Sequence, residues 1–195
     1  MDGHNTIIEI SWWVFAPSNF KRPLYEIVWI FLLIVREMPK FTEELMKHNA
    51  SFHVLGDMGK IPKKARLKLE EAVQTTKNNT RLRVCINVMY DGRMDVLQAI
   101  RNLSKEDIDI TNLSDSDLDS LISKRLYTAD CKPVDLLFIP WSAKWIRIRD
   151  FFLWQIRNAH VHWIDTLLPD VTMGELDFAI SRAGNSILTD WWRKT

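Results

Sequence analysis

The sequence contains few glycines and few cysteines, and each shortage argues against a class of site. Only 6 of its 195 residues are glycine, which argues against a glycine-rich phosphate loop. The 2 cysteines, Cys85 and Cys131, are too few for a disulfide framework. Neither cysteine lies in a Cys-x-x-Cys or Cys/His metal spacing. The sequence therefore predicts two thiols in a reducing compartment.

An excess of charge of one sign is also missing, as is any long hydrophobic run. Against 26 Lys and Arg stand 25 Asp and Glu, so no global field favours nucleic acid or an anionic membrane. The longest apolar run, residues 27–35, is far shorter than the roughly 20 residues of a membrane span. The N-terminus has the features of neither a signal peptide nor a transit peptide. We expect no nucleic-acid partner, no transmembrane segment and only a local anion site.

Aromatic residues, in contrast, are abundant. The chain has 9 Trp and 9 Phe, and 47% of its residues are hydrophobic, which predicts one globular domain over residues 1–195. Residues 27–35 carry no charge, and Pro23 and Pro39 bracket a predicted helix around them. A helix that is apolar on every side is enclosed by protein or lines an apolar cavity. The first interpretation is the more common.

Short apolar strands alternate with amphipathic helices along the rest of the chain. The pattern predicts strands at 51–55, 82–90, 134–138 and 161–164, and helices at 41–48, from 61, 94–101, after Ser114, and 175–180. This alternation is typical of an α/β protein with a mainly parallel sheet covered on both faces. Ligands are then expected at the carboxyl ends of the strands.

Several short motifs occur in a fixed order along almost the whole chain. They are MDG at residues 1–3, FAPSNFKRP at 15–23, LGD at 55–57, YDGR at 90–93, VDLL at 134–137, FLWQ at 152–155 and LPD at 168–170. In this order they resemble the cis-prenyltransferases, the family of the undecaprenyl and dehydrodolichyl diphosphate synthases. The resemblance is strongest to plant members, with an internal deletion near the N-terminus.

The resemblance implies a fold, a reaction and partners. The fold is a central, mostly parallel sheet flanked by helices, here incomplete, with a hydrophobic tunnel that Trp29, Phe31 and Leu32 line unless they are ordinary core. The enzymes condense isopentenyl diphosphate with an allylic diphosphate into cis-polyprenyl or short cis-prenyl diphosphates. They use Mg²⁺ and act as homodimers or as heterodimers with a homologue. Their compartments are the cytoplasm, the endoplasmic reticulum and the plastid.

The resemblance also assigns residues near the N-terminus. Asp2 matches a catalytic, metal-associated aspartate, and Gly3 a glycine beside phosphate. Asn19 matches a catalytic asparagine that assists removal of the proton lost on condensation, and Phe20 and Arg22 match its substrate-binding neighbours. Taken alone, residues 19–23 would more often be a polar turn before a helix.

Farther along the chain, Arg147 matches the first arginine of the segment that binds isopentenyl diphosphate. Arg149 stands where the family has serine and can donate to phosphate, whereas Asp150, in place of asparagine, would repel it. The alternative for these arginines is a solvated basic face.

Three departures from the family fall on the chemistry. The phosphate loop and a tunnel-wall helix are missing between Gly3 and Phe15. Residues 139–144 replace an Arg-Thr-Ser-Gly-Glu segment, and His160 replaces a metal-binding glutamate. We therefore expect little or no prenyl transfer by this exact chain. The alternative to an active enzyme is a degenerate member that serves as a non-catalytic partner subunit or binds an apolar ligand.

Overall fold

The computed structural model describes residues 7–140 and 151–189 of the chain. Contacts divide it into two compact units, one formed by Ile7–Asp130 and one that includes the residues from Cys131 onward. The expected single domain over residues 1–195 stays a prediction.

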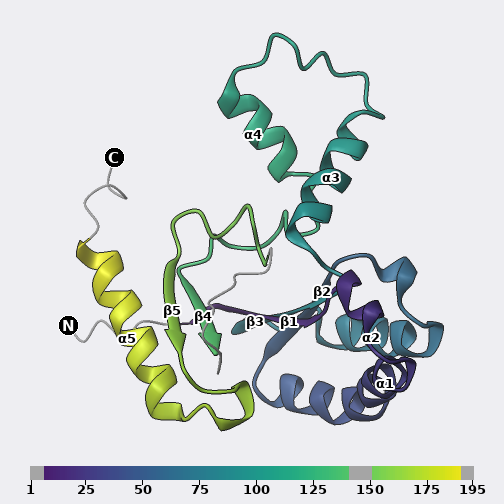
Figure 1. The fold of residues 1–195 in the computed structure, drawn as a ribbon, viewed down its shortest axis with the longest axis vertical. Coiled ribbons are helices and arrows are strands. Elements are labelled where there is room, and N and C mark those ends of the chain that lie inside the picture. The colour runs from purple at the N-terminus through teal and green to yellow at the C-terminus, as the bar shows by residue number, and fades with distance from the viewer. Residues whose placement is uncertain (1–6, 141–150, 190–195) are drawn as a thin grey trace. The chain divides into compact units, whose positions relative to one another are not determined.

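The first unit is built on three parallel strands in the order β1-β3-β2 (Figure 1). They are β1 (Glu9–Phe15), β2 (Ala50–Leu55) and β3 (Leu82–Val88). The strands expected at 51–55 and 82–90 are confirmed as β2 and β3, whereas periodicity gave no signal for β1. A register shift between Trp13 and Phe15 turns Phe15 toward the core, where it is fully buried.

Two helices cover the apolar face of this sheet. They are α1 (Leu24–Lys47) and α2 (Lys63–Thr76), and short 3₁₀ turns precede each of them, η1 (Pro17–Lys21) and η2 (Met58–Lys60). The core between helices and sheet includes Phe31 and Leu69 from the helices and Phe52, Val84 and Ile86 from the strands. Each helix follows a proline, Pro23 or Pro62, whose fixed φ suits a helix start and whose missing N–H is not needed there.

The prediction that Pro39 ends the first helix is wrong, because α1 continues through it to Lys47. A proline inside a helix removes one backbone hydrogen bond and crowds the preceding turn. Beyond Pro39, however, Phe41 packs edge-on against Phe52 with ring centroids 5.8 Å apart, and Leu45 is buried. Burial of these side chains on the sheet outweighs the local cost of the proline.

Helices α3 (Gly92–Leu103) and α4 (Asp115–Ser123) extend from the sheet as an arm (Figure 1). Asp91 accepts hydrogen bonds from the backbone N–H groups of Arg93 and Met94 and so starts α3. Ser114 caps α4 as predicted, accepting from the N–H of Asp117 at 3.2 Å. Just after α4, the guanidinium of Arg125 forms an ion pair with Glu106, which follows α3, with Nε 2.8 Å from Oε1.

The second unit contains a parallel pair of strands, β4 (Leu136–Pro140) and β5 (His160–Ile164), in which Leu136 lies opposite His160. A turn, η3 (Leu168–Asp170), and helix α5 (Met173–Thr189) follow, and α5 contacts both strands. The strands expected at 134–138 and 161–164 are confirmed with small shifts at their ends. Both units confirm the predicted α/β class with parallel strands. No helix among the described residues has the length and hydrophobicity needed to cross a membrane.

Candidate functional site

The carboxyl ends of β1, β3 and β2 meet at one edge of the first sheet, because the three strands are parallel. The chain leaving each strand bonds to its neighbour there: Tyr90 N–H donates to the Phe15 carbonyl at 3.4 Å, and Asp57 N–H to the Met89 carbonyl at 3.3 Å. Gly56 adopts a φ of +119°, and a Cβ on it would lie 2.2 Å from the carbonyl oxygen of Val88. Only glycine fits this close approach. In open α/β sheets this edge is where ligands bind.

Asn19 lies at this edge, in the turn η1 directly after β1. Its backbone N–H donates to the Ala16 carbonyl at 2.9 Å, and its side-chain Oδ1 accepts from the Ala16 N–H at 2.7 Å. Pro17 opens the turn, and the N–H of Arg22 closes it on the Asn19 carbonyl at 3.0 Å. The side chain of Asn19, which is half-buried, is therefore held by the turn that the sequence Ala-Pro-Ser-Asn forms.

Phe20 and Arg22 flank Asn19 on the same turn. The half-exposed Phe20 ring meets the buried Phe15 ring edge-on, with centroids 5.3 Å apart. A guanidinium nitrogen of Arg22 lies 3.6 Å from a carboxylate oxygen of Glu26. Arg22, Tyr25, Glu26, Trp29 and Ile30 line a shallow hollow of about 490 Å³. The structure thus brings together three predicted site residues, Asn19, Phe20 and Arg22, beside the first turns of α1.

Helix α1 divides into a buried face and an exposed apolar face. Phe31, one of the three residues expected to line a tunnel, is 6% exposed and packs on Phe15. It is therefore a core residue. Trp29 and Leu32 are 61% and 59% exposed, and both line a second hollow of about 350 Å³. The apolar face of α1 beside the Asn19 turn is therefore exposed. Covering this face with an apolar ligand would remove apolar surface from water, which is favourable.

Asp95 is a buried carboxylate to which the sequence assigned no role. It accepts hydrogen bonds from the N–H of Tyr127 at 2.6 Å and the hydroxyl of Thr128 at 2.9 Å. Burial nevertheless raises the pKa of Asp95 above its ordinary value. Burial and the carboxylates of Asp57 and Asp95 likewise raise the pKa of Tyr127. Asp95 thus ties the end of the arm to the start of α3. The adjacent YDGR motif was the only sequence signal for it.

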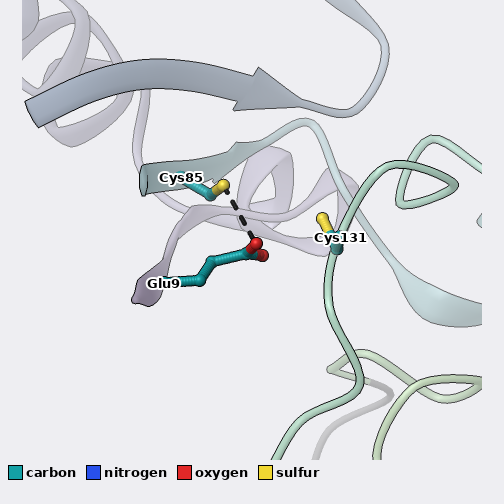
Figure 2. A group of neighbouring side chains, drawn as sticks. All are labelled: Glu9, Cys85 and Cys131. Atoms are coloured by element: carbon teal, nitrogen blue, oxygen red, sulfur yellow. Dashed lines mark hydrogen bonds between the residues drawn. The ribbon is translucent and has the colours of Figure 1, made fainter. Parts of the chain in front are cut away.

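The second face of the sheet carries polar side chains. Figure 2 shows Cys85, which is fully buried on β3, donating to Oε1 of Glu9 on β1 with Sγ 3.9 Å away. The other carboxylate oxygen of Glu9 lies 3.4 Å from Nε of Arg83. Cys131, also drawn there, belongs to the second unit. The first unit by itself therefore offers one sulfur and one carboxylate, whereas a structural zinc site takes four ligands. Neither cysteine forms a disulfide in the structure.

The other predicted site residues, Asp2, Gly3, Arg147 and Arg149, lie outside the described residues, as does Asp150. His160 begins β5 and is half-buried, at the position where the resemblance places a metal-binding carboxylate. An imidazole nitrogen suits hard, oxygen-seeking Mg²⁺ poorly. The described residues at this position therefore do not fit a magnesium site.

The protein is a parallel α/β protein with a polar turn at the carboxyl end of a strand, next to an exposed apolar helix face. This arrangement suits an amphipathic ligand that carries an anionic group. The chain belongs to the cis-prenyltransferase family: the family model described as "Putative undecaprenyl diphosphate synthase" matches residues 3–184. The family predicted from the ordered motifs is thus confirmed.

Curated relatives come from bacteria and plants. The chain is 31% identical over 172 residues to an isoprenyl transferase of Halalkalibacterium halodurans, a match that covers 88% of the chain and 66% of the relative. It is 32% identical over 162 residues to dehydrodolichyl diphosphate synthase 2 of Arabidopsis thaliana, covering 80% of the chain and 50% of the relative. The chain therefore spans between one half and two thirds of the length of these two relatives.

Solved structures share the fold. A probable undecaprenyl diphosphate synthase from Campylobacter jejuni superposes with a TM-score of 0.78 at 27% identity, covering 91% of this chain and 80% of that one. Lavandulyl diphosphate synthase from Lavandula x intermedia, solved with dimethylallyl diphosphate, gives a TM-score of 0.80 at 22% identity, covering 90% and 75%. The predicted cis-prenyltransferase fold is confirmed for the part of the chain that matches.

Proposed function

We propose that the chain functions in cis-prenyl chain elongation, the condensation of isopentenyl diphosphate with an allylic diphosphate. One observation carries the proposal: the η1 turn holds Asn19, Phe20 and Arg22 at the carboxyl end of β1, beside the exposed apolar face of α1. The family membership supports it, as do the names of the relatives, which include undecaprenyl and dehydrodolichyl diphosphate synthases.

The reaction needs both halves of this arrangement. A carbon–carbon bond forms between the two substrates, the allylic carbon–oxygen bond breaks, diphosphate leaves, and a proton is lost from the isopentenyl unit. Arg22 supplies a fixed positive charge near the turn, and a guanidinium can bind phosphate through two parallel N–H groups. Trp29 and Leu32 supply apolar surface for the prenyl chain. Gly3, Arg147 and Arg149 complete the proposed diphosphate sites, and Asp2 the catalytic set.

Enzymes of this family generally depend on a metal, and Mg²⁺ is the ion that we propose. Its expected protein ligand is Asp2, and the ion would offset the charge of the leaving diphosphate. His160 stands where a metal-binding carboxylate is expected. The roles proposed for Asn19, Phe20 and Arg22 therefore do not involve the metal.

We also propose a dimer, either of two copies or with a complete homologue, in the cytoplasm or at the endoplasmic reticulum or plastid. A dimer with a complete homologue corresponds to the alternative function, in which this chain is a non-catalytic partner subunit. The replacement of the metal carboxylate by His160 favours this alternative over full activity in isolation.

The test uses the full chain with Mg²⁺, labelled isopentenyl diphosphate and either geranyl or farnesyl diphosphate. Extended products that disappear in Asn19→Ala and Arg22→Ala variants support the elongation function. Products that appear only after a complete homologue is added, and in excess of that homologue alone, support the partner role. If neither mixture gives products above those of the homologue, and the chain binds no diphosphate, both proposals are wrong.

A further inference from the structure

Helix α1 presents an apolar stripe to the solvent in its N-terminal half. Five large side chains make up the stripe: Leu24 at 74% exposed, Tyr25 at 73%, Val28 at 47%, Trp29 at 61% and Leu32 at 59%. Steps of three and four residues place Tyr25, Trp29 and Leu32 along one face of the helix. Single exposed apolar residues are normal on a protein surface, whereas a contiguous group marks a site of interaction.

The stripe cannot be buried by a rotation of α1, because the opposite face of the helix is packed on the sheet. Ile27, Phe31, Met38 and Leu45 are buried there and belong to the core shared with the strands. At a rise of 1.5 Å per residue, residues 24–32 extend over only about 12 Å. The hydrocarbon core of a bilayer is about 30 Å thick. The stripe is therefore too short to span a bilayer, but it can lie on one.

Basic side chains stand at both ends of the stripe. Lys21 and Arg22 precede it in the η1 turn, and Arg36 and Lys40 follow it, seven and eleven residues beyond Trp29 and so on the same face of the helix. All four basic side chains are exposed. Residues 21–40 contain four basic and two acidic residues, a net charge of +2, whereas the whole chain carries only +1. This segment is therefore complementary to an anionic surface.

We propose that the exposed face of α1 docks onto an anionic lipid surface, with its apolar stripe in the boundary between headgroups and acyl chains. Tryptophan and tyrosine favour this boundary, because their rings are apolar and carry one polar edge. The long stems of Arg36 and Lys40 can cover apolar surface while their charges reach lipid phosphates. A helix that docks in this way lies in the plane of the surface, with its apolar face buried about 5 to 10 Å deep.

A second copy of this chain is a weaker candidate for covering the stripe. A stable protein interface buries about 800 Å² on each partner and takes roughly 20 to 30 residues a side, far more than five apolar side chains supply. Pairing of two such faces would also set two segments of net positive charge against each other. A lipid surface offers the opposite charge and needs no matching shape. Docking requires neither substrate nor turnover, so this inference does not depend on the proposed function.

The experiment is flotation of the full chain with unilamellar vesicles, without prenyl substrates. One set of vesicles contains equal parts of phosphatidylglycerol and phosphatidylcholine, and the other contains phosphatidylcholine alone. We expect the chain to bind the anionic vesicles at least about 10-fold more tightly than the neutral ones. Binding to the anionic vesicles should weaken as the salt concentration rises, because salt screens the charges.

The apolar part of the face is tested by the double variant Trp29→Ser/Leu32→Ser. Its binding to anionic vesicles should be at least about 10-fold weaker, because two large side chains no longer leave water. The matched control is Leu97→Ser/Ile100→Ser on α3, where the two side chains have the same spacing and are 50% and 46% exposed. This control should bind as the wild type does. Thermal melting shows whether each variant is folded.

The basic part is tested by Arg36→Gln/Lys40→Gln. At low salt this variant should bind at least about 5-fold more weakly, since each basic residue near the surface adds to the attraction. Lys63→Gln/Lys64→Gln, at the exposed start of α2, removes the same charge from another helix and should leave binding unchanged.

Quenching of tryptophan fluorescence by brominated phosphatidylglycerol locates the contact. The chain has 9 Trp, so the signal of Trp29 is measured as the difference between the wild type and Trp29→Phe. Phenylalanine keeps an aromatic ring, so this variant is expected to fold and to bind. We expect the Trp29 signal to be quenched by the brominated vesicles, and this measurement decides the question even if the serine variant does not fold.

Several results would overturn the inference. They are a wild type that does not bind anionic vesicles or binds neutral ones equally well, α1 variants that bind no more weakly than their controls, and a Trp29 signal that is not quenched. If the wild type sediments as a dimer without lipid and Trp29→Ser/Leu32→Ser sediments as a monomer, a second copy covers the face and lipid docking is wrong. The elongation assay contains no vesicles, so none of these results decides the proposed function.

Discussion

Removal of the buried Asp95 carboxylate is expected to destabilise the first unit strongly. Asp95 is 2% exposed and receives the Tyr127 N–H at 2.6 Å and the Thr128 hydroxyl at 2.9 Å. In Asp95→Ala both donors lose this acceptor in a buried place, and each such loss costs about 1 to 3 kcal/mol. Because the alanine also avoids burying a charge, the expected net loss in the free energy of unfolding is roughly 2 to 4 kcal/mol.

Asp95→Asn separates the charge from the hydrogen bonds. Its amide oxygen can still accept from Tyr127, and the Thr128 hydroxyl can rotate to accept from the new NH₂ group, so a loss of about 1 kcal/mol or less is expected. Because burial raises the pKa of Asp95 in the folded state, the folded protein holds this proton more tightly than the unfolded chain. The wild type should therefore gain stability relative to Asp95→Asn as the pH falls from the raised folded pKa toward the ordinary value of 3.8.

Urea unfolding followed by circular dichroism, at pH 7 and at pH 5, measures both effects. Asp107→Asn, on the exposed loop of the arm, removes an equal charge and serves as the control. A loss below about 1 kcal/mol for Asp95→Ala would show that the two donors find other partners and would refute the reasoning. A wild type that loses stability relative to Asp95→Asn on acidification would contradict the sign of the pKa shift.

Three further substitutions test other parts of the fold. Gly56→Ala has to place a Cβ against the Val88 carbonyl at a positive φ, so we expect a loss of about 2 to 3 kcal/mol or no folded protein, measured by thermal melting, whereas Gly59→Ala should be tolerated. Phe31→Ala is expected to lower the free energy of unfolding by about 3 to 4 kcal/mol, because it leaves a cavity in the core. Trp29→Ala, on the exposed face of the same helix, should change it by less than about 1 kcal/mol. Equal losses for the two variants would show that Trp29 is covered in solution. Arg125→Ala breaks the ion pair with Glu106 and should speed limited proteolysis between residues 106 and 114 without a change in the melting temperature. An unchanged cleavage rate would mean that other contacts hold this loop.

The alternation of strands and helices, the caps at Asp91 and Ser114 and the helix after Pro23 were all predictable, because they depend on local periodicity and on side chains that bond to nearby backbone. The continuation of α1 past Pro39 was not, since the burial of Phe41 and Leu45 that compensates the proline involves a strand ten residues or so away in sequence. Strand β1 escaped prediction for a different reason: its bulge between Trp13 and Phe15 breaks the alternation of apolar and polar residues by which strands are found.

For the candidate site, the order of short motifs by itself determined the family and named Asn19, Phe20 and Arg22, because their spacing on one turn is a property of the chain. What only the tertiary structure decided is how these groups present themselves. The fold commits the carbonyl oxygen of Asn19 to Ala16, separates the buried Phe31 from the exposed Trp29 on one apolar helix, and brings Asp95 under Tyr127, more than thirty residues away. Such choices depend on which face of a helix meets the sheet and which backbone groups lie opposite, and those are fixed only when segments distant in sequence pack together.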